Sequence, residues 1–161
     1  MFILGIDPGS RVAGYGLVEL SKRKVVYLDS GIIKFKCDTD FFSRLVEIHQ
    51  EFRSLQEKWD IDEIAFESLI YTKNVNSLIK LSQARAAMIT AFSGVRDARF
   101  FEYAPNQIKS AVSGFGHADK LGVQKALSLI LNRKLEFKSH DEADALAIAC
   151  CHALMRECQN T

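Results

Sequence analysis

Cysteine, proline and net charge are all scarce in this chain of 161 residues, which has four cysteines, two prolines and a formal net charge of +1. The cysteines have no Cys-x-x-Cys spacing. Cys37 stands alone, and Cys150, Cys151 and Cys158 lie beside His152 in one expected helix. This pattern favours reduced core thiols in a cytoplasmic protein over a disulfide framework or a zinc site. The near-neutral charge excludes a globally basic surface, so any nucleic-acid-binding surface has to be local.

Long apolar runs are absent too. The opening run at residues 2–6 is interrupted by Gly5, ends at Asp7 and has no basic leader, so we expect neither a signal peptide nor a membrane span. The apolar fraction of 48% and the charged fraction of 25% are typical of a globular protein. The length fits one domain, expected over residues 1–161, and no repeat or linker is visible.

The apolar periodicity predicts strands first and alternating helices and strands afterwards. Residues 2–6, 11–20 and 25–35 are expected to form an antiparallel meander. Helices are expected at 39–59, 74–95, from Pro105, at 120–131 and at 140–157, and two further strands at 61–68 and 99–104. This order predicts a mixed α/β sheet of five strands, with the fourth strand parallel to the first and helices on its faces.

Two carboxylates are predicted at the carboxyl ends of neighbouring strands. Asp7 begins the turn Asp-Pro-Gly-Ser, in which Pro8 presets φ and Gly9 tolerates a positive φ, so that a second strand can follow at once. The turn by itself leaves open whether Asp7 caps the turn or serves a function. Glu67 ends the fourth strand, after an apolar stretch, and should lie close to Asp7.

Further acidic residues lie at the far end of the fourth strand and at the start of the last helix. Asp62 and Glu63, at the far end of the fourth strand, are expected in a solvated loop. Asp141 and Asp144 share one face at the start of the last helix. Favourable interaction with the helix dipole explains an acid at position 141, in the first turn. It does not explain Asp144, because small apolar residues flank Asp144 and its side chain should point toward the sheet.

Four carboxylates that converge at one point repel one another unless divalent cations neutralise them. Hard oxygen ligands favour Mg²⁺, with Mn²⁺ as a substitute. A pair of such ions hydrolyses phosphodiesters by activating water at one ion and stabilising the leaving oxygen at the other. The acids at positions 7, 67, 141 and 144 therefore indicate a metal-dependent phosphodiester hydrolase.

Several segments, taken in order over nearly the whole chain, resemble the RuvC family of bacterial Holliday-junction resolvases, within the ribonuclease H-like superfamily. They read GIDPGSRVAGYG, FES followed by KNVNSLIKLSQARA, FEYAPNQIKSAVSGFGHADK and HDEADALAIA. The resemblance implies a homodimeric, Mg²⁺-dependent endonuclease of recombination and repair that nicks a four-way junction twice, with RuvA and RuvB as partners. It makes Asp7, Glu67, Asp141 and Asp144 the catalytic metal ligands and places Lys109 and Lys120 near the scissile phosphate.

Other positions are assigned through the same resemblance. Ile70 stands where similar members carry an aromatic residue that stacks on DNA, and Tyr71 is expected to take over that role. Some relatives use a histidine in the acidic cluster, which leaves open whether His140 or Asp141 faces the metal. The remaining candidate contacts to DNA phosphates are Lys73, Lys80 and Arg85.

The helix expected at 74–95 carries apolar residues on two sides. One side is expected to pack on the sheet, and the second favours contact between two subunits. Two other functions also fit parts of the pattern: a phosphate-binding module of the actin and Hsp70 type, and a non-catalytic ribonuclease H-like protein of the YqgF group. Cleavage of four-way junctions but not of linear duplex distinguishes these alternatives.

Overall fold

The computed structural model describes residues 1–69, 74–93 and 98–159. Its sheet has five strands in the order β3-β2-β1-β4-β5. The first three strands pair antiparallel, whereas β1, β4 and β5 pair in parallel. The strands are β1 (Phe2–Asp7), β2 (Val12–Ser21), β3 (Lys24–Lys34), β4 (Glu63–Glu67) and β5 (Arg99–Tyr103). The predicted mixed sheet is therefore confirmed, including the parallel pairing of the first and fourth strands.

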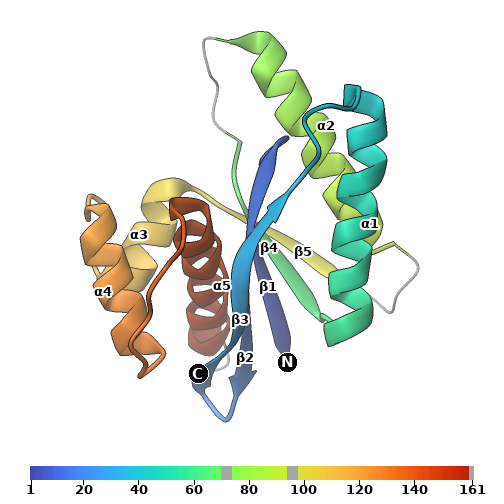
Figure 1. The fold of residues 1–161 in the computed structure, drawn as a ribbon. Coiled ribbons are helices and arrows are strands. Elements are labelled where there is room, and N and C mark those ends of the chain that lie inside the picture. Colours follow the sequence, from blue (N-terminus) through green and yellow to red (C-terminus); the bar gives the residue numbers. More distant parts are fainter. Residues whose placement is uncertain (70–73, 94–97, 160–161) are drawn as a thin grey trace.

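Helices cover both faces of the sheet, as Figure 1 shows. On one face lie α1 (Phe41–Trp59) and α2 (Val75–Ala91); on the other lie α3 (Pro105–Ser113), α4 (Lys120–Ile130) and α5 (His140–Gln159). Each layer encloses its own apolar core. No helix in the described part of the chain is both long enough and apolar enough to span a membrane.

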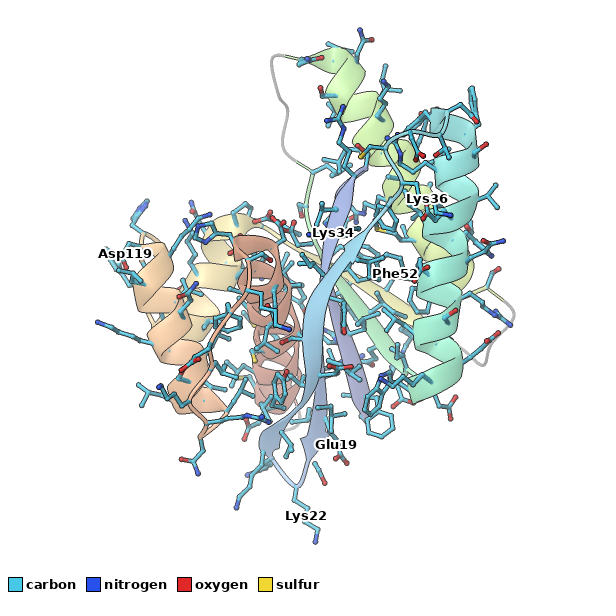
Figure 2. The ribbon with its side chains drawn as sticks, viewed as in Figure 1. Glu19, Lys22, Lys34, Lys36, Phe52 and Asp119 are labelled. Atoms are coloured by element: carbon cyan, nitrogen blue, oxygen red, sulfur yellow. The ribbon has the colours of Figure 1, made fainter. Side chains whose placement is uncertain are left out.

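Helix α1 illustrates how local sequence sets an element. Asp40 caps its first turn, because its carboxylate accepts hydrogen bonds from the backbone N–H groups of Phe42 and Ser43. Four residues apart on one face, Ile48 and Phe52 are fully buried. Figure 2 shows Phe52 pointing from α1 toward the sheet. The predicted apolar stripe of this helix therefore forms core.

Helix α5 lies unusually close to the sheet because glycines face it. A Cβ atom added at Gly5 would lie 2.2 Å from the carbonyl oxygen of Ala145, and one added at Gly16 would lie 2.4 Å from the Cα of Leu146. Small residues line much of this helix, and Ala145 and Ala149 are fully buried. Backbone therefore rests on backbone where α5 crosses β1 and β2.

The structure refines two interpretations of the sequence, at Gly9 and at the cysteines. The turn does not use the tolerance of Gly9 for a positive φ, since Gly114 is the only glycine with a positive φ among the described residues. Gly9 is needed for a close approach, because a Cβ there would lie 1.8 Å from the carbonyl oxygen of Val12. The four cysteines are free thiols, but only Cys150 and Cys151 are buried, whereas Cys37 and Cys158 are exposed.

Candidate active site

Three elements bring acidic residues to one end of the sheet. Asp7 is the last residue of β1 and Glu67 the last residue of β4, and these strands are parallel neighbours. Gly14 is the register partner of Asp7 on β2, and a Cβ atom there would lie 2.0 Å from the carbonyl oxygen of Asp141. The first turns of α5, which carry Asp141 and Asp144, therefore stand directly beside the end of β1.

The half-buried carboxyl group of Asp7 is the most perturbed of these acids. Burial, followed by the negative charges of Asp144, Asp141 and Glu67, raises its pKa to about 7. The positive charge of Lys120 lowers the pKa of Asp7, but by less than burial and the neighbouring acids raise it. Asp7 accepts no hydrogen bond from its own turn within the described residues, so its predicted role as a turn cap is not observed.

Glu67 and Asp144 show the same effect more weakly. Burial raises the pKa of both carboxyl groups, and the charge of Asp144 raises that of Glu67 further. Lys109 counteracts the shift at both acids, and Lys120 does so at Asp144. Two ammonium groups therefore face the carboxylates.

A pocket of about 210 Å³ joins these groups. Glu67 and Asp144 line it on the side of the sheet and α5, and Lys109 and Lys120 line it on the side of α3 and α4. Figure 2 shows Asp119, the residue that caps α4 directly before Lys120, at the edge of this helical layer. The remaining lining is apolar: Pro105, Ile108, Val123, Ala147 and Ile148.

The donor set suits a hard divalent cation. All four candidate ligands are carboxylates, and none of them forms an ion pair within the described part of the chain. Their mutual repulsion is the condition that a bound cation relieves. As they stand, no three acidic, histidine or cysteine side chains among the described residues are arranged to hold a metal ion.

The other candidate residues divide into three groups. His140 is exposed at the first position of α5, and its charge acts to lower the pKa of Asp144. Lys80 is exposed, with its ammonium group 5.6 Å from the centre of the Phe41 ring. Ile70, Tyr71 and Lys73 lie outside the described residues.

Arg85 requires a correction. It was expected to contact DNA phosphates, but it is buried, pairs with Glu102 and lies 4.8 Å above the ring of Phe66. Its guanidinium group is engaged between α2, β4 and β5. We therefore remove Arg85 from the candidate DNA contacts.

Glu63 also requires a correction. It was expected in a solvated loop, but it is the first residue of β4, is fully buried and accepts a hydrogen bond from His152. These two residues are 89 positions apart, and nothing in the local sequence pairs them. The apolar residues 64–66 that follow Glu63 were the only signal that it lies inside.

The order of strands, the helices on both faces and the acidic cluster at the ends of β1 and β4 define a ribonuclease H-like protein. The family model of the crossover junction endodeoxyribonuclease RuvC matches residues 3–152. The chain belongs to the RuvC family.

Individual relatives agree with this assignment. The RuvC crossover junction endodeoxyribonuclease of Legionella pneumophila is 43% identical over 156 residues, which cover 96% of this chain and 87% of the relative. That of Thermosipho melanesiensis is 38% identical over 154 residues, which cover 96% and 98%. The solved structure of Thermus thermophilus RuvC matches with a TM-score of 0.88 at 27% identity, over 99% of this chain and 97% of that one. The same protein in complex with Holliday junction substrate matches with a TM-score of 0.87 at 25% identity, over 98% of this chain and 96% of that one.

Proposed function

We propose that this protein is a Mg²⁺-dependent endonuclease that resolves Holliday junctions by paired symmetric nicks. The observation that carries the proposal is the mutual electrostatic influence of Asp7, Glu67 and Asp144, which come from three separate elements. Membership in the RuvC family and the Holliday junction bound to the Thermus thermophilus relative support a four-way junction as the substrate.

Asp7, Glu67, Asp141 and Asp144 would hold the cations, with two ions per site. We assign Asp141 rather than His140 to this set, because the negative charge of Asp141 acts on the carboxyl group of Asp7 and because Mg²⁺ prefers carboxylate oxygens to imidazole. When bound, such ions lower the pKa of a water and stabilise the leaving oxygen of a phosphodiester. The half-buried position of the carboxylates strengthens their attraction for a cation, since the surrounding dielectric is lower than that of water.

Lys109 and Lys120 would orient the scissile phosphate. Both line the pocket with Glu67 and Asp144, so their ammonium groups are placed to contact non-bridging phosphate oxygens while the carboxylates hold the cations. The lysines also offset part of the negative charge of the empty cluster. This charge balance lets a polyanion approach four carboxylates.

Two symmetric nicks call for two active sites related by a two-fold axis, so we propose a homodimer. Helices α1 and α2 expose large apolar side chains that suit such a contact. These are Phe42, Val46, Val75 and Ile79, each between 49% and 74% exposed. The other proposed partners are RuvA and RuvB, and the proposed setting is recombination and DNA repair in the cytoplasm.

The deciding experiment compares a four-way junction with a linear duplex of the same sequence in Mg²⁺. The wild-type protein should cut the junction at two symmetric positions and leave the duplex intact. Glu67→Gln should bind the junction with wild-type affinity without cutting it, because an amide of nearly the same shape is no charged ligand. Junction binding without cleavage by the wild type would instead indicate a non-catalytic ribonuclease H-like protein.

A further inference from the structure

A buried polar chain links Tyr103 of β5 and His152 of α5 to Glu63, at the opposite end of β4 from the acidic cluster. The hydroxyl group of Tyr103 is 2.6 Å from Nδ1 of His152, and Nε2 of His152 is 2.6 Å from Oε2 of Glu63. Glu63 and His152 are at most 1% exposed. Arg156 contacts both carboxylate oxygens of Glu63, at 2.9 and 2.6 Å, and Arg99 contacts Oε1 at 2.5 Å.

The protonation states of this chain follow from its surroundings. Burial lowers the pKa of His152, although Glu63 acts against this shift. Burial also acts to raise the pKa of Glu63, but hydrogen bonds from Arg156 and His152 outweigh it and leave the pKa below its ordinary value. A neutral His152 therefore donates from Nε2 to the Glu63 carboxylate and accepts at Nδ1 from the Tyr103 hydroxyl. In this arrangement each hydrogen-bonding group of the chain has a partner.

The contact between Glu63 and His152 is separated from the acidic cluster along the same strand and the same helix. Glu63 and Glu67 are four residues apart on β4, a span of about 13 Å at roughly 3.3 Å per residue. Asp144 and His152 are eight residues apart on α5, a span of about 12 Å at roughly 1.5 Å per residue. Because the two spans match, contact between His152 and Glu63 aligns Asp144 with Glu67.

Other contacts also hold α5: Leu146 and Ile148 lie in the apolar core of this layer, and Glu142 accepts a hydrogen bond from the Ser30 hydroxyl of β3. Where α5 crosses β1 and β2, glycines permit a close backbone approach. The apolar contacts of this layer are non-directional, whereas the hydrogen bonds of the buried polar chain require a defined geometry. The carboxylates at its first turns repel those of the strands. Buried polar groups that must all find their partners are one means of specifying a single arrangement.

We propose that Glu63, His152 and Tyr103 are positioning residues that set the register of α5 against β4, so that Asp144 and Glu67 face each other across the cation site. Tyr103 extends this effect to the site itself, since its backbone carbonyl accepts a hydrogen bond from the N–H of Ser68, the residue after Glu67. This inference rests on the proposed function, because it presupposes that the carboxylates bind a cation.

The test measures Mn²⁺ binding to the DNA-free protein by titration calorimetry. Tyr103→Phe removes one hydroxyl and leaves the ring, so we expect a folded protein whose Mn²⁺ affinity falls about fivefold, less than the roughly 10–100-fold loss that follows removal of a group bonded to a metal ligand itself. Junction affinity measured in chelator should stay unchanged. The Mg²⁺ concentration for half-maximal cleavage should rise by a similar factor.

Phe52→Leu is the matched control, because Phe52 is fully buried on the other face of the sheet. It should lower the unfolding temperature without changing Mn²⁺ affinity. A second pair of variants tests rescue: His152→Gln keeps an N–H donor for Glu63 and should retain more Mn²⁺ affinity than His152→Leu.

Mn²⁺ affinity within twofold of wild type in Tyr103→Phe and in both His152 variants would overturn the positioning role and leave the proposed function standing. A wild-type protein that binds no Mn²⁺ and cuts no junction would overturn the proposed function, and this inference with it.

Discussion

Gly14 of β2 and Asp141 of α5 are in backbone contact: a Cβ atom on Gly14 would lie 2.0 Å from the carbonyl oxygen of Asp141 and 3.2 Å from the Cβ of Ala145. Since Gly14 is also the register partner of Asp7, the same contact places the first turn of α5 beside the end of β1. The acidic cluster therefore depends on a residue without a side chain.

Replacing this glycine should be costly. Gly14→Ala forces α5 off the sheet, and we expect it to lower the free energy of unfolding by about 3 kcal/mol, the upper end of the range for overpacking. Urea denaturation would measure the loss. Gly116→Ala is the control, because its nearest neighbour lies at an ordinary 3.4 Å, and it should change the free energy by less than about 0.5 kcal/mol. Equal stability of the two variants would contradict the contact.

Asp7→Asn should separate stability from activity. The substitution removes a charge that three carboxylates oppose, so the metal-free variant should unfold at a higher temperature than wild type at pH 8. It should also fail to cut junctions, because a metal ligand is lost. Calorimetric melting in chelator, alongside junction cleavage in Mg²⁺, measures both effects. Lower stability of Asp7→Asn at pH 8 would show that the cluster does not strain the fold.

The metal-free protein should lose stability as the pH rises. The pKa of Asp7 lies near 7 in the folded state, whereas an unfolded aspartate titrates near 4. The folded state therefore binds more protons between these values, and the free energy of unfolding falls as pH increases from about 4 to 7. Urea midpoints at several pH values would measure the slope. Saturating Mg²⁺ should reduce it, and Asp7→Asn should flatten it even without metal.

The choice of cation should affect cleavage and binding differently. Mg²⁺ and Mn²⁺ accept near-octahedral sites, whereas Ca²⁺ takes more ligands at longer distances. We expect cleavage in Mg²⁺ and Mn²⁺ and none in Ca²⁺, with the junction bound in all three. Gel-based cleavage and binding assays with each cation test this expectation. Full cleavage in chelator would exclude the proposed chemistry.

Similar family members carry a DNA-stacking aromatic residue at the position of Ile70. In this chain, Tyr71 is expected to take over that role and to stack on an unpaired base at the opened junction centre. Stacking on an aromatic ring is worth about 1–3 kcal/mol per base. Tyr71→Ala should therefore weaken junction cleavage, whereas Tyr71→Phe should not, because the ring does the stacking. Fluorescence of a base analogue at the junction centre would report the contact. The same signal from wild type and both variants, at matched thermal stability, would exclude Tyr71.

Much of this architecture is encoded locally. Apolar periodicity predicted each element, and the parallel pairing of the fourth strand with the first followed from the change from a meander to alternating helices and strands. The positions of Asp7 and Glu67 at adjacent strand ends also followed, because parallel neighbours present their carboxyl ends at the same edge. These features depend on residues close in sequence, where turn chemistry and side-chain period act directly.

The partners of buried charges were decided only by tertiary packing. Glu63 resembles any surface acid in sequence, yet α5 and β5 surround it with His152, Arg156 and Arg99. Arg85 resembles a phosphate contact, yet its side chain is buried and pairs with Glu102, which is exposed at the surface. A charged side chain can be buried only where opposite charges and hydrogen bonds meet it. Those partners come from residues up to 93 positions away, so their meeting is a property of the folded layers and not of any local pattern.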